Sequence, residues 1–169
     1  MATKDSTIVS FGSSKTIRLD SLDRFDTCLT GPMHIKASKP IYSYQTPCLD
    51  ANFNNNAFSA FAVTLSSTEE LITESLFSTL DEPDSLNHYV LSAVTKTNAI
   101  SNFKLNGQQL SNLFAPFPQD SSWSWANVEL SKGNYKAQSD SGFHAYQYTW
   151  YNIYGKRTLC KAYYARGES

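Results

Sequence analysis

The chain has 169 residues, a formal net charge of −1 and a sequence pI of about 6.3. It therefore lacks the basic field that attracts phosphate backbones, and we expect no nucleic-acid partner. No stretch approaches the roughly 18 consecutive apolar residues of a membrane span, so we expect no membrane insertion. Charged residues make up 17% of the chain and aromatic residues 14%, a balance that favours half-buried strands over helices.

Short runs of alternating polarity begin near the N-terminus. Residues 6–11 (STIVSF) and 15–19 (KTIRL) flank Gly12-Ser13-Ser14 and predict two strands joined by a turn. Residues 57–65 (AFSAFAVTL) are rich in β-formers and apolar throughout, as expected of a central strand.

The next feature is the segment between the first two of three cysteines, Cys28, Cys48 and Cys160. It contains two strand runs, 33–35 and 41–45, which we interpret as a hairpin between loops. A Cys28–Cys48 disulfide would close a loop of about 20 residues and stabilise the fold by about 3 kcal/mol in the chain-entropy model. The alternative is three inert thiols. With the bridge, Cys160 stays free or pairs outside this segment.

Residues 67–80 carry mixed signals. Ser67-Thr68-Glu69-Glu70 resembles a helix start, whereas Thr73, Phe77 and Thr79 suit a strand. We predict a strand preceded by at most one helical turn.

Strand patterns resume after Pro83. The predicted strands are 89–95, 100–105, 123–130, 135–138 and 143–151. Asn106-Gly107 predicts a tight hairpin turn, because both residues can adopt positive φ, and residues 132–134 predict another turn. About twelve short strands, with at most one short helical turn, predict an all-β fold. We expect a single antiparallel β-sandwich domain over residues 1–169.

The sequence contains no pattern that specifies catalysis, a cofactor or a metal site. His34, His88 and His144 lack ligand spacing, and CxxC, GxSxG and phosphate-loop motifs are missing. We therefore predict a non-enzymatic chain with no cofactor. Acidic residues stand in predicted loops: Glu69, Glu70, Asp81, Glu82 and Asp84. A hydrolase whose carboxylates converge only in the fold remains an alternative.

The densest signal is aromatic. In the run 143–151, one strand face carries His144, Tyr146, Tyr148 and Trp150. Rings exposed in such a row can stack on sugars or fill a protein interface, so these four are the candidate binding residues. The alternative is that the rings fill the space between two sheets. Trp123 and Trp125 share a face of their own strand, with the same two interpretations.

Four motifs in order resemble the IgGFc-binding protein N-terminal domain family. They are 31–44 (GPMHIKASKPIYSY), 95–107 (TKTNAISNFKLNG), 121–133 (SSWSWANVELSKG) and 142–148 (GFHAYQY). The resemblance covers about Thr7 to Gly155. It departs from the family pattern after Tyr148, where Thr149-Trp150-Tyr151 stands in place of a glycine turn.

The resemblance implies an extracellular or cell-surface module, cut from a larger protein, in which no catalytic residue can be transferred. We expect a non-catalytic adhesion or ligand-binding module with a protein or glycan ligand and with neighbouring domains as further partners. The family name alone does not assign IgG binding to this chain. A carbohydrate-binding module using exposed aromatics and a structural spacer are further alternatives.

Overall fold

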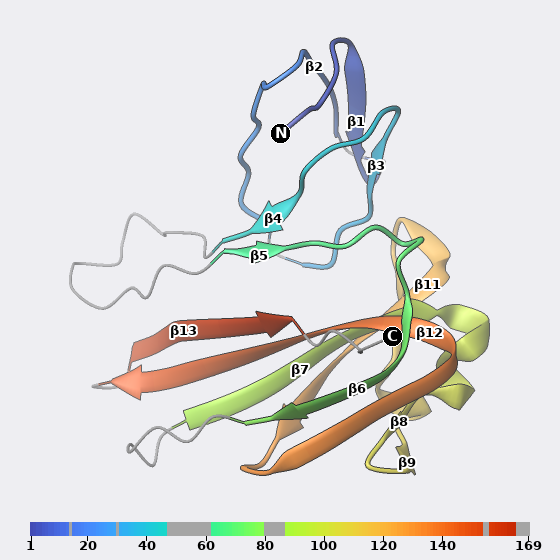
Figure 1. Ribbon diagram of the computed structural model, residues 1–169, viewed down its shortest axis with the longest axis vertical. Coiled ribbons are helices and arrows are strands. Elements are labelled where there is room, and N and C mark those ends of the chain that lie inside the picture. Colours follow the sequence, from blue (N-terminus) through green and yellow to red (C-terminus); the bar gives the residue numbers. More distant parts are fainter. Residues whose placement is uncertain (14, 30, 47–61, 80–86, 154–155, 165–169) are drawn as a thin grey trace.

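The computed structural model describes residues 1–13, 15–29, 31–46, 62–79, 87–153 and 156–164; for residue 87 and residues 150–164 it describes only the backbone. The described residues form thirteen strands and two short 3-10 helices, with no α-helix among them (Figure 1). All strand pairs are antiparallel. The predicted all-β antiparallel class is confirmed.

The N-terminal part of the chain forms two small sheets. The first has the order β2-β1-β3, from β1 (Thr7–Phe11), β2 (Lys15–Leu19) and β3 (Ile35–Ala37). The second pairs β4 (Tyr44–Gln45) with β5 (Val63–Thr64). Phe11 lies opposite Lys15, which confirms the predicted first hairpin.

The prediction of a hairpin between Cys28 and Cys48 is wrong. Strand β3 pairs with β1, and β4 pairs with β5, so the two strands of that segment have different partners. The predicted central strand 57–65 lies mostly outside the described residues. Its described end forms β5, which belongs to the two-stranded sheet.

The rest of the chain forms one large curled sheet of eight strands, drawn in the lower half of Figure 1. Its main order is β10-β11-β7-β12-β8-β9, and β6 and β13 also pair with β12. The strands are β6 (Ile72–Ser78), β7 (Asn87–Lys96), β8 (Lys104–Leu105), β9 (Gln108–Gln109), β10 (Ala115–Phe117), β11 (Asp120–Leu130), β12 (Asn134–Ile153) and β13 (Lys156–Tyr164).

Strand β12 joins the two halves of this sheet. The runs 135–138 and 143–151, expected as separate strands, are parts of one 20-residue strand. Its first part pairs with β6 and β8, and its second part pairs with β7 and β13. Between Gln138 and Phe143 the register shifts, and Gly142 has a φ of +79°. A register shift of this kind bends a strand and changes its partners, so it lets the sheet curl.

The main core lies inside the curl. It is centred on Phe103, whose ring meets those of Phe114 and Phe143 edge-on at centroid distances of 5.2 Å. Leu91, Ala93 and Ala145 are fully buried around it. The burial of Phe103 explains one correction: in place of the predicted strand 100–105, the chain forms a 3-10 helix, η1 (Thr97–Asn102), followed by the short β8.

Two local predictions near this core are confirmed. The segment after residue 67 forms a hydrogen-bonded turn, in which Glu70 N donates to Ser67 O at 2.9 Å, and then strand β6. Asn106 and Gly107 have φ values of +50° and +78° and form the tight turn between β8 and β9. A second 3-10 helix, η2 (Ser111–Leu113), follows β9.

Candidate functional site

The predicted aromatic row on β12 is not an exposed surface. His144, Tyr146 and Tyr148 are only 5%, 7% and 9% exposed, and the side chain of Trp150 lies outside the described part. On the opposite face of the strand, Phe143 is also fully buried. Both faces of β12 are therefore covered over residues 143–149, and for His144, Tyr146 and Tyr148 the interpretation as side chains that fill the space between sheets agrees with the structure.

These buried rings attach the β4–β5 segment to the large sheet. Tyr146 and Tyr148 pack against Val63 and Leu65. Ser66 N donates to Tyr146 Oη at 3.1 Å, and Tyr148 Oη donates to Gln45 Oε1 at 2.8 Å. Burial, with a smaller effect from Tyr146, raises the pKa of Tyr148 to about 12. The two tyrosines act as structural anchors.

His144 lies in the same interface. Within the described part of the chain, neither of its ring nitrogens makes a hydrogen bond. Burial lowers the pKa of His144, because the charged imidazolium loses its hydration there. The Ser67 backbone and the Glu70 carboxylate oppose this effect to a smaller extent. The imidazole is thus stable in its neutral form.

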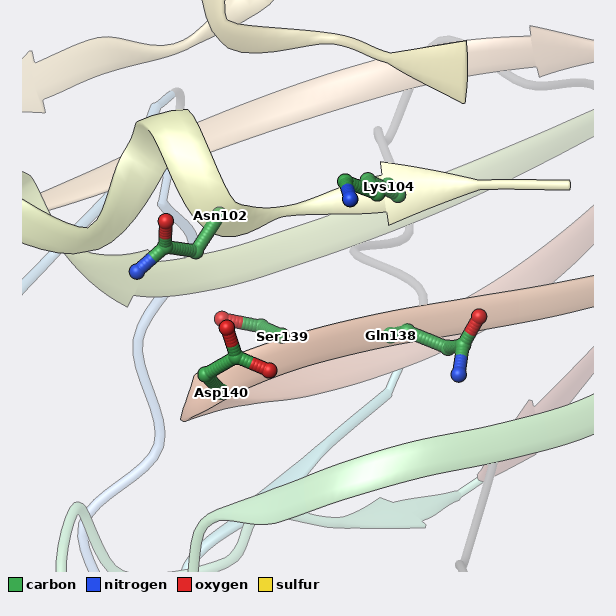
Figure 2. A pocket seen from close by; sticks show the side chains of 5 residues that line it. All are labelled: Asn102, Lys104, Gln138, Ser139 and Asp140. Carbon is green, nitrogen blue, oxygen red and sulfur yellow. The ribbon is translucent and has the colours of Figure 1, made fainter. Parts of the chain in front are cut away.

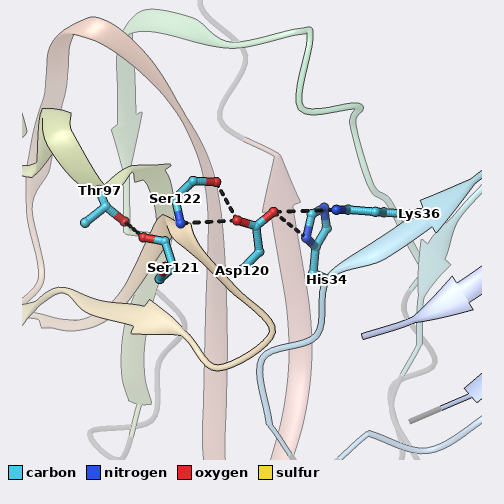
Figure 3. Close-up of polar contacts among 6 residues, drawn as sticks. All are labelled: His34, Lys36, Thr97, Asp120, Ser121 and Ser122. Carbon is cyan, nitrogen blue, oxygen red and sulfur yellow. Dashed lines mark hydrogen bonds and ion pairs between the residues drawn. The ribbon is translucent and has the colours of Figure 1, made fainter. Parts of the chain in front are cut away.

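A polar cluster joins the N-terminal sheet to the large sheet (Figure 3). Asp120, the first residue of β11, places Oδ2 3.0 Å from His34 Nδ1 and 3.9 Å from Lys36 Nζ. Its Oδ1 accepts hydrogen bonds from the backbone and side chain of Ser122. The Ser122 bonds chiefly, and the charges of His34 and Lys36 secondarily, lower the pKa of Asp120. The carboxylate is therefore ionised and already engaged.

Beside this cluster lies a shallow hollow of about 430 Å³, which we call the Trp123 hollow; it is lined by Lys96, Thr97, Asn98, Ser122 and Trp123. The pairing of β11 with β7 places Trp123 opposite Lys96, and η1 adds Thr97 and Asn98. Trp123 is partly exposed, and Lys96 and Asn98 are exposed. An aromatic ring surrounded by polar groups is an arrangement typical of ligand-recognition sites.

The geometry of the hollow is fixed by hydrogen bonds to its edge. Thr97 Oγ1 donates to Ser121 O at 2.7 Å (Figure 3). The same oxygen lies 2.9 Å from Ser124 Oγ. Ser122 is held by Asp120. These bonds connect the start of η1 to β11, so the hollow is built on sheet and helix backbone whose positions are tied together.

A second, smaller pocket of about 120 Å³ lies where β12 loses its regular pairing (Figure 2); it is lined by Asn102, Lys104, Gln138, Ser139 and Asp140. Ser139 is 2% exposed, and its hydroxyl has no hydrogen-bond partner among the described residues. Gln138 Nε2 donates to Glu74 Oε2 at 2.9 Å. A polar space of this size suits ordered water molecules.

The remaining sequence predictions concern metals, acids and cysteines. Within the described ranges, no group of three or more His, Cys, Asp or Glu side chains is placed to hold a metal ion. Glu69 and Glu70 are exposed in a turn, and the other three loop acids lie outside the described residues. Cys28 is exposed before β3, whereas Cys48 and the side chain of Cys160 are not described, so the Cys28–Cys48 disulfide stays a prediction.

Sequence reasoning found Trp123 but missed its neighbours. Alternation placed Trp123 and Trp125 on one strand face, which is correct for β11. Lys96 joins the hollow through the register between β7 and β11, and Asn98 joins it through the 3-10 helix η1, of which only residues 100–102 had been predicted, as the start of a strand. The one signal in the sequence was the pair of polar residues, Lys96 and Thr97, directly after the predicted strand 89–95.

A comparison with known protein families gives a match over most of the chain. A family model described as IgGFc binding protein matches residues 1–149. The chain belongs to the IgGFc-binding protein family. The match ends one residue before Trp150, at the place where the sequence departs from the family pattern. It includes every residue of the Trp123 hollow and of the Asp120 cluster.

Neither the curated proteins nor the solved structures contain a match to this member of the IgGFc-binding family. None of the helices in the described ranges has the length and apolar character needed to cross a membrane.

Proposed function

We propose that this chain is a non-catalytic extracellular module that binds a protein or glycan ligand, and that the ligand docks at the Trp123 hollow. The proposal includes all 169 residues as one unit of a larger secreted or surface protein. Membership of a family described as a binding protein supports recognition as the activity. The observation that carries the location is the partly exposed Trp123 above a hollow with a polar rim.

The chemistry of the hollow favours recognition over hydrolysis. Its rim offers an ammonium group, an amide and hydroxyls, and none of the lining residues that the structure describes carries a carboxylate. The nearest acid along the chain, Asp120, is engaged by His34, Lys36 and Ser122. A glycosidase needs two carboxyl groups across a cleft, and this hollow supplies neither.

The hollow also distinguishes this site from other exposed aromatics. Tyr42 is 61% exposed and Tyr44 is 44% exposed, but Tyr42 lies just before β4 and Tyr44 in β4, and neither lines either pocket. A ring that lines a concave site contributes more binding energy than a ring on a convex surface, because the ligand removes more of it from water.

The test is a binding panel of immunoglobulins, mucins and glycans on the immobilised full chain, measured by biolayer interferometry. We expect saturable binding to at least one class. Trp123→Ala should weaken that binding at least tenfold, whereas the matched surface variant Tyr42→Ala should leave it unchanged.

Circular dichroism and thermal melting must first establish that both variants remain folded. If a ligand binds and the two variants have equal affinity, the site lies elsewhere on the molecule. If the folded chain binds nothing in the panel, the module is a spacer and the proposed function is wrong.

A further inference from the structure

The unused hydrogen-bonding groups of the Trp123 hollow specify the ligand more closely than the family does. Three groups at the hollow can donate and make no hydrogen bond or ion pair within the described part of the chain: the Lys96 ammonium, the Asn98 amide and the Trp123 indole N–H. All three are hydrogen-bond donors that line the same hollow, and one of them carries a positive charge.

The charge balance around the hollow is positive. Lys96 is exposed and unpaired in the described structure, and no lining residue is acidic. Asp120 lies three residues before Trp123 on β11, but His34, Lys36 and Ser122 already bind its two oxygens. A carboxylate or sulfate group on the ligand would therefore meet a cation without a competing anion.

The hydroxyl groups of Ser122 and Thr97 require hydrogen-bond donors on the ligand. The Ser122 hydroxyl proton is donated to Asp120, so Ser122 Oγ faces a ligand only as an acceptor. Thr97 Oγ1 likewise donates to Ser121 O. A ligand that satisfies this rim must itself donate hydrogen bonds, as alcohol groups do, while it presents an acid to the cationic side.

The ring of Trp123 adds an apolar surface, so the ligand needs a flat C–H face as well as hydroxyls and an acid. These three properties occur together in an acidic pyranose. An acidic peptide provides the charge but lacks both the flat face and the row of alcohol donors. The volume of about 430 Å³ falls within the range of about 300–1,000 Å³ typical of small-ligand sites.

We propose that the Trp123 hollow binds an acidic sugar residue, a uronic acid, a sialic acid or a sulfated pyranose, with Lys96 facing its acid group and Trp123 stacking on its ring. This inference rests on the proposed function, since it names the ligand class of the same site. Lys96 sets the preference for acid, and Trp123 sets most of the affinity.

Two matched ligand pairs test the class on the full chain: sialyllactose against lactose, and a hyaluronan tetrasaccharide against its carboxyl-reduced form. Hexaglutamate serves as the acidic peptide. Affinity is measured by calorimetry and by tryptophan fluorescence at 50 and 200 mM salt. We expect at least one acidic sugar to bind about two- to fivefold more tightly than its neutral partner, with weaker binding at the higher salt concentration.

Variants then assign the contacts. Lys96→Gln should weaken the binding of the acidic ligand about two- to fivefold and abolish the preference over the neutral partner. The control variant Lys4→Gln, at an exposed lysine on the N-terminal segment, should leave both affinities unchanged. Trp123→Ala should weaken both members of the pair at least tenfold. Should Trp123→Ala fail to fold, Asn98→Ala, which removes an exposed side chain from the rim, must lower affinity for the acidic sugar in its place.

The inference is overturned if neutral and acidic partners bind equally, if hexaglutamate binds as tightly as the sugars, or if neither sugar pair binds. It is also overturned if Lys96→Gln and Trp123→Ala leave sugar binding intact. Immunoglobulin or mucin-protein binding that is lost in Trp123→Ala, without any sugar binding, would overturn the acidic-sugar class and leave the proposed function standing. Failure of both binding assays would overturn both.

Discussion

Replacing Gly142 with alanine should be among the most damaging single-methyl changes in this chain. Gly142 has a φ of +79°, which costs an alanine about 1–2 kcal/mol. A Cβ at this position would also lie 2.6 Å from Leu71 Cβ. Because Leu71 Cβ cannot move without its backbone, overpacking adds about 1–3 kcal/mol. We expect Gly142→Ala to lower the free energy of unfolding by about 2–5 kcal/mol.

Two other glycines separate these two effects. Gly107 has a φ of +78° but open space around its Cβ position, so Gly107→Ala should cost only the backbone term of about 1–2 kcal/mol. Gly133 has no left-handed φ, and its added Cβ would meet Tyr135 at an ordinary 3.9 Å. Gly133→Ala should therefore be neutral or stabilise by up to about 1 kcal/mol.

The assay is urea denaturation of the unmodified chain and the three glycine variants, monitored by tryptophan fluorescence. The m-values are compared as a check on two-state behaviour. From the most to the least stable variant, the expected order is Gly133→Ala, Gly107→Ala, Gly142→Ala. If Gly142→Ala is no less stable than Gly107→Ala, the close packing of β12 against Leu71 at the bend does not exist, and the reasoning is refuted.

Two further predictions concern the interior. Phe103→Ala should destabilise the chain by about 3–5 kcal/mol because it empties the centre of the core, whereas Leu113→Ala, at a side chain 45% exposed, should cost less than about 1 kcal/mol by the same denaturation assay. His144 has a pKa below its ordinary 6.5 in the folded state, so the unfolded chain binds more protons below that pH. Stability should therefore fall as pH drops from 7.5 to 5.5, and His144→Gln should reduce that fall; an unchanged pH profile would contradict the burial of a neutral imidazole.

Much of the strand pattern is readable from the sequence because alternation reports local geometry. The runs that became β1, β2, β7 and β11 alternate as strands do, and Asn106-Gly107 specifies its turn through backbone preference alone. These features depend on neighbours within a few residues, so no knowledge of the distant chain is needed.

What the sequence did not reveal depends on contacts between distant residues. Alternation in β12 defines two faces, but only the packing of β4 and β5 onto one of them buries Tyr146 and Tyr148. In the same way, the run 100–105 has an alternating pattern, yet burial of Phe103 between Phe114 and Phe143 favours a 3-10 turn before a two-residue strand. The Trp123 hollow needs the register between β7 and β11 and therefore could not be assembled from motifs.

The position of β12 has a consequence for how this chain matures on the ribosome. Strands β6, β7 and β8 all pair with β12, which begins only at Asn134. During synthesis, β6, β7 and β8 must wait for this central partner, with unsatisfied strand edges and apolar side chains open to other molecules. Pairings that span this much sequence also form slowly. The large sheet therefore cannot be completed until β12 has been synthesised, so most of its pairing follows the translation of the earlier strands and does not accompany it.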